Sequence, residues 1–268
     1  MVNLALAVAL AAASPAVPAA TNDADPAMFV VRDADTTVYI FGTFHALDGQ
    51  SDWFNDAVRE AFDRSGELVL ETVIPEVREV SEPTFSEGSR EHLRSLSVTP
   101  SASFLATTRM AINAGRSQGM QVAKGADMVL RRAAEAEGKR VEGLETLQSQ
   151  FLMFSRMPAA AAAPAPRPGT PVENPMDNLS KAMAEMQAAW KRGDQHVFVH
   201  MLDQLRRSSP DTYRMMFTER NARWADWIAG RMQTPGTVFV AVGAGHLAGR
   251  DSLLVRLAEQ GIESSRLN

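Results

Sequence analysis

Apolar and polar positions along the chain follow two patterns, short apolar runs typical of buried strands and longer amphipathic stretches typical of helices. The apolar runs predict strands at residues 28–31, 37–44, 67–74, 139–144 and 237–242. The amphipathic stretches predict helices at 52–66 with Asp52 as N-cap, near 146, and at 101–119, 126–137, 176–192, 194–208, 211–232 and 249–260. Strands that alternate with helices predict an α/β fold with a central mixed sheet flanked by helices.

The N-terminal segment departs from these patterns. Residues 4–13 form an uninterrupted apolar run followed by small residues, which is typical of a signal peptide and shorter than the roughly 20 apolar residues that span a bilayer. We therefore expect residues 1–20 to be removed and the mature protein to be periplasmic or secreted. No Lys or Arg precedes the run, so an Ala-rich tail or a buried N-terminal helix stays open as the alternative.

A second unusual segment is rich in Pro and Ala and spans residues 158–175. Proline removes backbone donors and favours extended chain, which predicts an exposed insertion. We expect residues 21–268 to form one domain that carries this insertion.

Composition narrows the possible chemistry. The chain has 268 residues, a net charge of −5 and no cysteine, which excludes disulfides, thiolate metal sites and a thiol nucleophile. Any metal must therefore bind to His, Asp or Glu. The mildly acidic balance argues against nucleic acid as a partner, and no later segment is apolar enough to predict a stable membrane span. The oligomeric state is left open.

One phrase occurs twice in the chain: an apolar strand followed by Gly-x-x-His. The first copy contains Gly42 and His45, and the second contains Gly243 and His246. Glycine permits an unusual turn at the end of a strand, and α/β sheets bind ligands at the carboxyl ends of their strands. Either histidine alone would indicate a hydrogen-bonded turn residue. The matched pair predicts two imidazoles that converge on one site.

Glu71 is the third candidate, because it lies inside the apolar strand ELVLETVI. Burial of a carboxylate without a partner costs several kcal/mol, so either a metal ion or a structural Arg or Lys must compensate it. Two histidines and one carboxylate are a common ligand set for zinc, manganese, iron or cobalt.

Polar residues elsewhere are candidates with open alternatives. Glu145 follows a short strand and is a metal ligand, a general base or a helix N-terminal charge. Arg220 and Asn221 either form a solvated helix face or hold a substrate carbonyl and its oxyanion. Asp127 is best explained as a helix cap. His196 and His200 share a helical spacing but lack the Glu of the HExxH motif, and His92 has no visible partner.

Five phrases in order resemble one known family. FGTFHALDG, LVLET, KGADMVLRRAAEAEGKRVEGLETLQSQ, ERNARWADWI and VFVAVGAGHLAG resemble the TraB/GumN family from about Phe29 to the C-terminus, with the Pro/Ala insertion as the departure. The family is similar to the Tiki proteases and, more remotely, to erythromycin esterases and haem-binding ChaN-like proteins. The resemblance implies metal-dependent hydrolysis in the Tiki branch. His45, Glu71 and His246 match its site positions, and Glu145, Arg220 and Asn221 match further motif positions.

These observations lead to one leading hypothesis, an exported metal-dependent hydrolase acting on a peptide or another small-molecule substrate. His45, Glu71 and His246 would hold one divalent ion, with Mn, Co and Zn equally compatible. Glu145 would serve as general base, and Arg220 or Asn221 would stabilise the oxyanion. The alternative is a non-catalytic envelope protein that uses the same histidines to bind haem or another ligand.

Overall fold

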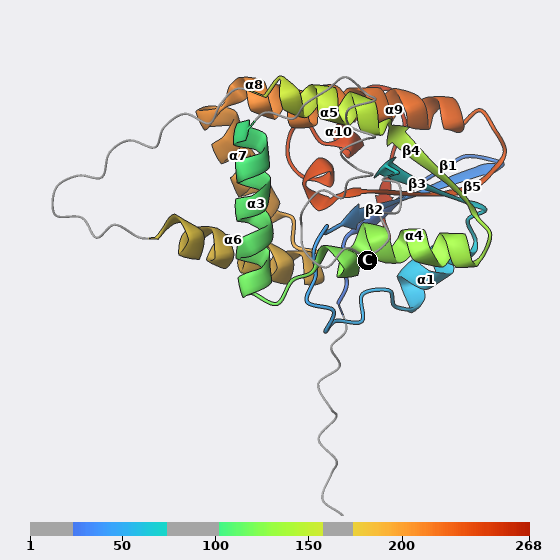
Figure 1. The fold of residues 1–268 in the computed structure, drawn as a ribbon. Helices are drawn as coiled ribbons and strands as arrows, with labels where there is room; N and C mark the ends of the chain where they lie inside the picture. Colours follow the sequence, from blue (N-terminus) through green and yellow to red (C-terminus); the bar gives the residue numbers. More distant parts are fainter. Residues whose placement is uncertain (1–23, 74–101, 158–173) are drawn as a thin grey trace, which may run out of the picture.

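The computed structural model describes residues 24–73, 102–157 and 174–268. Within these residues the strands form one mixed sheet in the order β4-β3-β5-β2-β1-β6. The strands are β1 (Met28–Arg32), β2 (Thr36–Thr43), β3 (Glu67–Thr72), β4 (Arg140–Glu145), β5 (Gly236–Gly243) and β6 (Ser265–Arg266). With helices on both faces of this sheet (Figure 1), the α/β prediction is confirmed.

The centre of the sheet is parallel. Strands β4, β3, β5 and β2 run in the same direction, and β1 pairs antiparallel with both β2 and β6. The sequences TVYIFGT and TVFVAVG are apolar on both faces, as expected of strands covered by helices on both sides. Strands β2 and β5 pair from Thr36 opposite Gly236 to Thr43 opposite Gly243. This register places the two Gly-x-x-His segments side by side at the carboxyl ends of neighbouring strands.

Helices cover the two faces of the sheet in two separate apolar layers. One layer packs α1, α4, α6 and α7 against Phe41, Leu70 and Phe239, and the other packs α9 and α10 against Ile40, Val69 and Val240. Figure 1 shows α9 and α10 above the sheet and α1 and α4 below it, with α3, α6 and α7 to one side. The helices are α1 (Asp56–Asp63), α3 (Ala102–Ser117), α4 (Ala126–Ala136), α5 (Leu147–Ser155), α6 (Pro175–Lys191), α7 (His196–Ser208), α8 (Pro210–Tyr213), α9 (Glu219–Arg231) and α10 (Leu253–Glu259).

The predicted helix starts at 52 and 249 are too early, and the one at 176 is one residue late. Helix α10 begins at Leu253, because the Ser252 side chain caps it. Helix α1 begins at Asp56, not after Asp52, because the Asn55 side chain accepts a hydrogen bond from the backbone N–H of Val58 and so forms the N-cap. Helix α6 begins at Pro175, inside the predicted insertion, because Asn174 caps it and proline suits the first helical position. Residues 1–23 and 158–173, which contain the predicted signal peptide and most of the insertion, lie outside the described residues.

The predicted helix at 211–232 is divided by a π-helix, η2 (Arg214–Thr218), between α8 and α9. The wider turn places the Met216 carbonyl 3.3 Å from Nη1 of Arg220, which donates a hydrogen bond to it. Such π-helical segments are frequent at functional sites. This one lies immediately before the two α9 residues that the sequence proposes as site residues.

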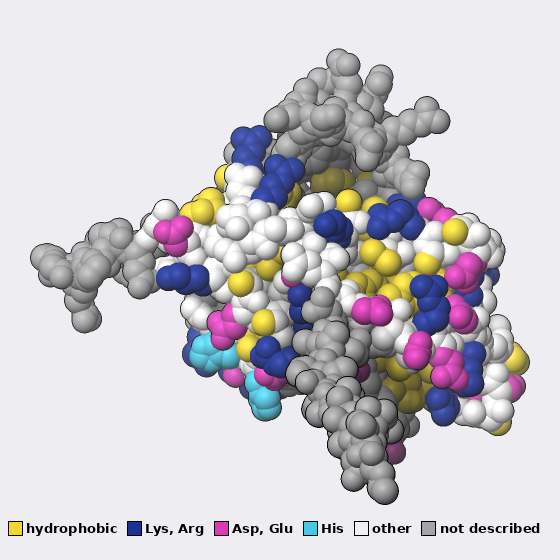
Figure 2. All heavy atoms as spheres, turned by 90° about the horizontal axis from the view of Figure 1, so that it is seen from below, with side chains coloured by type: hydrophobic (Ala, Val, Ile, Leu, Met, Phe, Trp, Pro, Cys, Tyr) yellow, Lys and Arg dark blue, Asp and Glu magenta, His cyan; other side chains and the backbone are white. Residues whose placement is uncertain are grey.

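The surface seen in Figure 2 carries acidic and basic side chains next to one another, with hydrophobic side chains between them. Ion pairs between exposed side chains, such as Arg59 with Glu137, agree with this mixed distribution. Among the described residues, no helix combines the length and apolar character needed to cross a membrane.

Candidate functional site

The predicted site residues lie at the end of the sheet where its parallel strands finish. His45 follows β2, Glu71 is in β3 and Glu145 ends β4. His246 lies in η3 (Ala244–Leu247), the 3-10 helix directly after β5, while Arg220 and its neighbour Asn221 begin α9. These positions are at the carboxyl ends of the four parallel strands, which is where α/β folds bind ligands.

Arg220 connects three of the other predicted residues. Its Nη2 donates to Oε2 of Glu71 at 2.6 Å, and its Nε lies 3.0 and 3.1 Å from the two carboxylate oxygens of Glu145. Its Nη1 donates to Nε2 of His246 at 3.2 Å. The residue is only 2% exposed, so its charge must be balanced inside the protein. The structural alternative for Glu71, pairing with an arginine, is therefore present.

His246 is held in one tautomer. Its Nδ1 lies 2.6 Å from Oδ1 of Asn221, and Nδ2 of the same amide donates to the Asp251 carbonyl at 2.7 Å. Since the amide oxygen can only accept, the proton is on Nδ1 and the lone pair is on Nε2. Burial lowers the pKa of His246 to about 3, and the nearby charge of Arg220 acts in the same direction. The imidazole is therefore neutral.

Glu71 is ionised. Burial favours its neutral form, but the charges of Arg220 and His45 and a hydrogen bond from the backbone N–H of Gly243 hold its pKa well below the usual range. The Gly243 N–H donates to Oε1 at 2.7 Å. The same oxygen lies 3.7 Å from Nε2 of His246. A permanently charged carboxylate thus faces a neutral imidazole.

His45 differs from His246 in being accessible. Its side chain is 63% exposed, and its Nδ1 lies 3.3 Å from Oδ1 of Asp127. Desolvation by surrounding atoms lowers its pKa, but the hydrogen bond and charge of Asp127 outweigh this and raise it to about 9. Asp127 is therefore not the helix cap predicted from the sequence. Helix α4 is capped by Gly125, and Asp127 lies within the first turn with its carboxylate directed to His45.

Gly243 lies where the three proposed metal ligands meet. A Cβ atom placed on it would lie 3.1 Å from Oε1 of Glu71, 3.3 Å from Nε2 of His45 and 3.7 Å from Cδ2 of His246. Three side chains that are far apart in the sequence therefore surround one backbone position. The space that a side chain would occupy at this position is open to them because the residue is glycine.

The sequence matches a known protein family over most of its length. The model of the TraB/PrgY/gumN family matches residues 27–86 and 89–266. The chain belongs to this family. All six predicted site residues of this TraB/PrgY/gumN chain lie within the matched ranges. Neither curated proteins nor solved structures gave a match to the chain.

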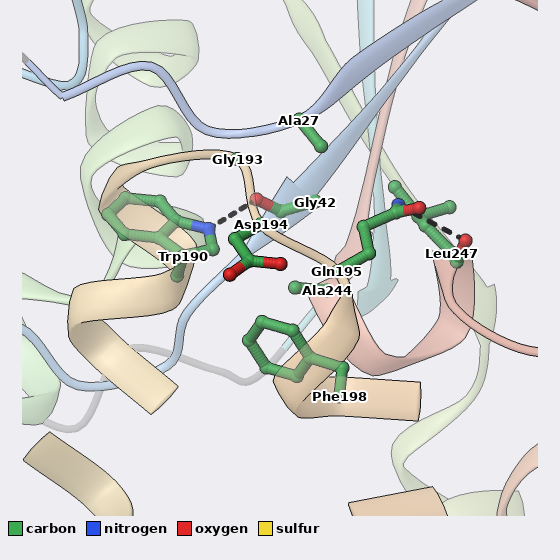
Figure 3. Close-up of a pocket in the computed structure, with 9 residues that line it drawn as sticks. All are labelled: Ala27, Gly42, Trp190, Gly193, Asp194, Gln195, Phe198, Ala244 and Leu247. Carbon is green, nitrogen blue, oxygen red and sulfur yellow. Dashed lines mark hydrogen bonds between the residues drawn. The ribbon is translucent and has the colours of Figure 1, made fainter. Parts of the chain in front are cut away.

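Helices α6 and α7 anchor both Gly-x-x-His segments of this TraB/PrgY/gumN protein. Nε1 of Trp190 donates to the Gly42 carbonyl at 2.7 Å, and Nε2 of Gln195 donates to the Leu247 carbonyl at 3.2 Å. Figure 3 shows these bonds on opposite sides of a small hollow at the α6–α7 turn. The same two helices thereby fix the strand end before His45 and the turn that carries His246.

Glu71 and His246 offer donor atoms of the kind that a divalent ion binds, whereas His45 would have to release a proton first, because its pKa is raised to about 9. Glu71 is ionised, and each imidazole has its Nδ1 next to an oxygen, of Asn221 for His246 and of Asp127 for His45. Metal-bound histidines usually have their second nitrogen oriented in this way. In the present arrangement, no three His, Asp or Glu side chains of the described residues converge closely enough to enclose an ion. His196 and His200 lie exposed on α7, and His92 lies outside the described residues.

Several partners of the site were not predicted from the sequence. Arg223 donates to Oε1 of Glu145 at 3.1 Å, the Asp251 carbonyl orients Asn221, and the Gly243 N–H orients Glu71. Arg223 lies three residues after Arg220 and so on the same side of the helix. This spacing could have predicted that both arginines contact the same carboxylate. The two backbone groups gave no signal, because every residue except proline carries an N–H and every residue a carbonyl.

Proposed function

We propose that this TraB/PrgY/gumN chain is an exported metal-dependent hydrolase that cleaves peptide bonds. The observation that carries the proposal is that side-chain atoms of Glu71, His45 and His246 lie within 3.7 Å of the Cβ position of Gly243, at the carboxyl ends of the parallel strands of the mixed sheet. The TraB/GumN resemblance implies a site at these residues, and the family match supports the resemblance itself. The resemblance to Tiki proteases directs the proposal to peptide bonds, and the apolar run at residues 4–13 directs it to export.

Glu71, His45 and His246 would hold the ion through one carboxylate and two imidazoles. A divalent ion at such a set lowers the pKa of a coordinated water towards about 7 and polarises a carbonyl group. Mn, Co and Zn all accept these ligands. Asn221 keeps the lone pair of His246 on Nε2, and the Gly243 N–H keeps Glu71 oriented.

The remaining predicted residues take supporting roles in this proposal. The carboxylate of Glu145 accepts hydrogen bonds from Arg220 and Arg223, which favours a role in positioning Arg220 over the predicted role as general base. Asn221 has its amide engaged with His246 and Asp251, which favours orientation of the imidazole over oxyanion binding. Arg220 carries the charge suited to an oxyanion, but its guanidinium is buried against Glu71 and His246.

The test is digestion of a peptide library by the purified mature protein, with and without a chelator. We expect cleavage that the chelator abolishes and that Mn²⁺, Co²⁺ or Zn²⁺ restores. Separate alanine substitutions at His45, Glu71 and His246 should abolish cleavage, whereas His196→Ala, which changes an exposed histidine on α7, should retain it. Full activity in all three folded site variants would contradict the proposal.

Two further measurements separate the alternatives. Haem titration followed by Soret absorbance tests the ligand-binding alternative, and a stoichiometric band that is lost in His45→Ala would favour it over the hydrolase. N-terminal sequencing of the protein from the cell envelope tests export. A mature N-terminus near Ala20 is the expected result, and an intact Met1 in a cytoplasmic fraction would contradict it.

A further inference from the structure

The lone pair of His246 has a single possible partner at a time. Because Nδ1 carries the proton that Asn221 accepts, Nε2 offers the only lone pair of the ring. Nη1 of Arg220 already donates to that lone pair at 3.2 Å. An ion that binds Nε2 must therefore take the place of this arginine hydrogen bond.

Arg220 also interacts with the second proposed ligand. Its Nη2 lies 2.6 Å from Oε2 of Glu71, and the side chains of the two residues are only 3% and 13% exposed. The guanidinium thus makes contact with two of the three proposed ligands from one position. A cation on Glu71 and His246 would lie next to a buried positive charge, which is unfavourable at short distance.

The charges of the cluster already balance with the arginines in place. The carboxylates of Glu71 and Glu145 face the guanidinium groups of Arg220 and Arg223, with contacts of 2.6 to 3.1 Å. The buried carboxylates are therefore compensated by charges of the chain itself and need no added ion for that purpose.

We propose that Arg220 acts as an internal cation that binds the ligand atoms of Glu71 and His246 in the metal-free chain. Metal binding then requires the Nη groups of Arg220 to leave these atoms. This inference rests on the proposed function. Nε of Arg220 lies within hydrogen-bond distance of both oxygens of Glu145, and Arg223 holds that carboxylate from the other side. Glu145 therefore retains the arginine at the edge of the site, where its released Nη groups become available to a substrate oxygen. Metal affinity is set by competition with a residue of the chain itself.

The test compares metal affinity in the wild type, Arg220→Met, Arg220→Lys and Arg223→Met, with Mn²⁺, Co²⁺ and Zn²⁺ each titrated alone by calorimetry. Arg223→Met removes the other arginine on Glu145 without a contact to Glu71 or His246, so it shows the effect of losing a nearby positive charge alone and should change the affinity less than Arg220→Met. Removal of a charged hydrogen bond that competes for the ligands should tighten binding about ten- to hundredfold in Arg220→Met. Arg220→Lys keeps the charge but loses the forked geometry of the guanidinium, so its metal affinity should lie between those of the wild type and Arg220→Met.

The outcomes distinguish the inference from the proposed function. A wild type that binds metal, together with a folded Arg220→Met that binds no more tightly, overturns the inference alone. Absence of metal binding in the wild type and in every folded variant overturns both. If Arg220→Met does not fold, the metal affinity of Arg220→Lys and nitrogen NMR of the wild type test the inference instead. We expect Zn²⁺ to perturb Nε2 of His246 and the Arg220 guanidinium together, and an unperturbed guanidinium would contradict the inference.

Discussion

Asn221 and His246 form a pair in which the Nδ1–H of the imidazole donates to the amide oxygen at 2.6 Å. The amide cannot turn over without losing its own bond to the Asp251 carbonyl. The orientation of a helix residue therefore determines which nitrogen of the histidine faces Glu71 and Arg220. Both members of the pair are almost fully buried, so water does not compete for these groups.

Replacing Asn221 with alanine should loosen this arrangement. A buried polar group that loses its partner costs about 1–3 kcal/mol of stability, and loss of such an outer contact weakens metal sites about 10- to 100-fold. Urea unfolding and metal titration measure the two effects. Asn178→Ala, on the exposed side of α6, is the control and should change neither. Equal metal affinity in Asn221→Ala and wild type would contradict the positioning role.

Glu71→Gln should destabilise the fold strongly. The substitution keeps the shape of the side chain but leaves the buried Arg220 short of one of its two carboxylates. Breaking a buried ion pair in this way costs about 3 kcal/mol. Glu60→Gln removes a carboxylate from an exposed pair with Arg64 and should cost less than about 1 kcal/mol. Chemical denaturation measures the free energy of unfolding of both variants. A similar loss of stability in the two would contradict the role of Glu71 in balancing the buried charge of Arg220.

Gly125→Ala should disturb the His45 loop. A Cβ at this position would lie 2.2 Å from the His45 carbonyl oxygen, a contact that only backbone movement can relieve. Forced overpacking of this kind costs about 3 kcal/mol. The opposite result is expected for Gly230→Ala in α9, where nothing lies within 4 Å and the gain in helix propensity is about 1 kcal/mol. Thermal unfolding of the two variants should therefore shift in opposite directions.

Tyr213 provides a prediction at high pH. Burial raises its pKa to about 12, and the hydrogen bond to Asp251 acts in the same direction. Because the folded chain holds this proton more tightly than the unfolded chain, the stabilisation is complete below about pH 10 and is lost as the pH rises through about 12. The chain has two tyrosines, so phenolate absorbance of the wild type and Tyr213→Phe isolates this group. Ionisation of Tyr213 near pH 10 would contradict the structure.

The sheet could be predicted because its strands are apolar on both faces. The strands now seen as β2, β3 and β5 carry uninterrupted Val, Ile, Leu and Phe, and only a parallel sheet with helices on both sides buries them fully. The two-residue strand β6 was not predicted, because Ser265 and Arg266 are polar and pair only with Phe29 and Val30 at the sheet edge. Such a short edge strand depends on its neighbour and not on its own composition.

The site was predictable at the level of residues but not of their partners. Gly-x-x-His and a carboxylate inside an apolar strand are local signals, so His45, Glu71 and His246 were found. Asp127 was assigned to a cap because the sequence shows only its helix, whereas its contact with His45 depends on how α4 packs against the loop after β2. Contacts between separate elements depend on the packing of the whole fold, which no local spacing encodes.

The π-helix Arg214–Thr218 determines the rotational phase of α9. Successive residues of an α-helix are about 100° apart around its axis, so an α-helix and a π-helix of equal length present different faces at their ends. Winding the same five residues as an α-helix would rotate every later side chain by about 100°, because an α turn closes one residue sooner than a π turn. Arg220 and Asn221 would then point away from the sheet edge while the helix itself remained intact. The alignment of the site with the sheet thus depends on the number of residues in one short turn.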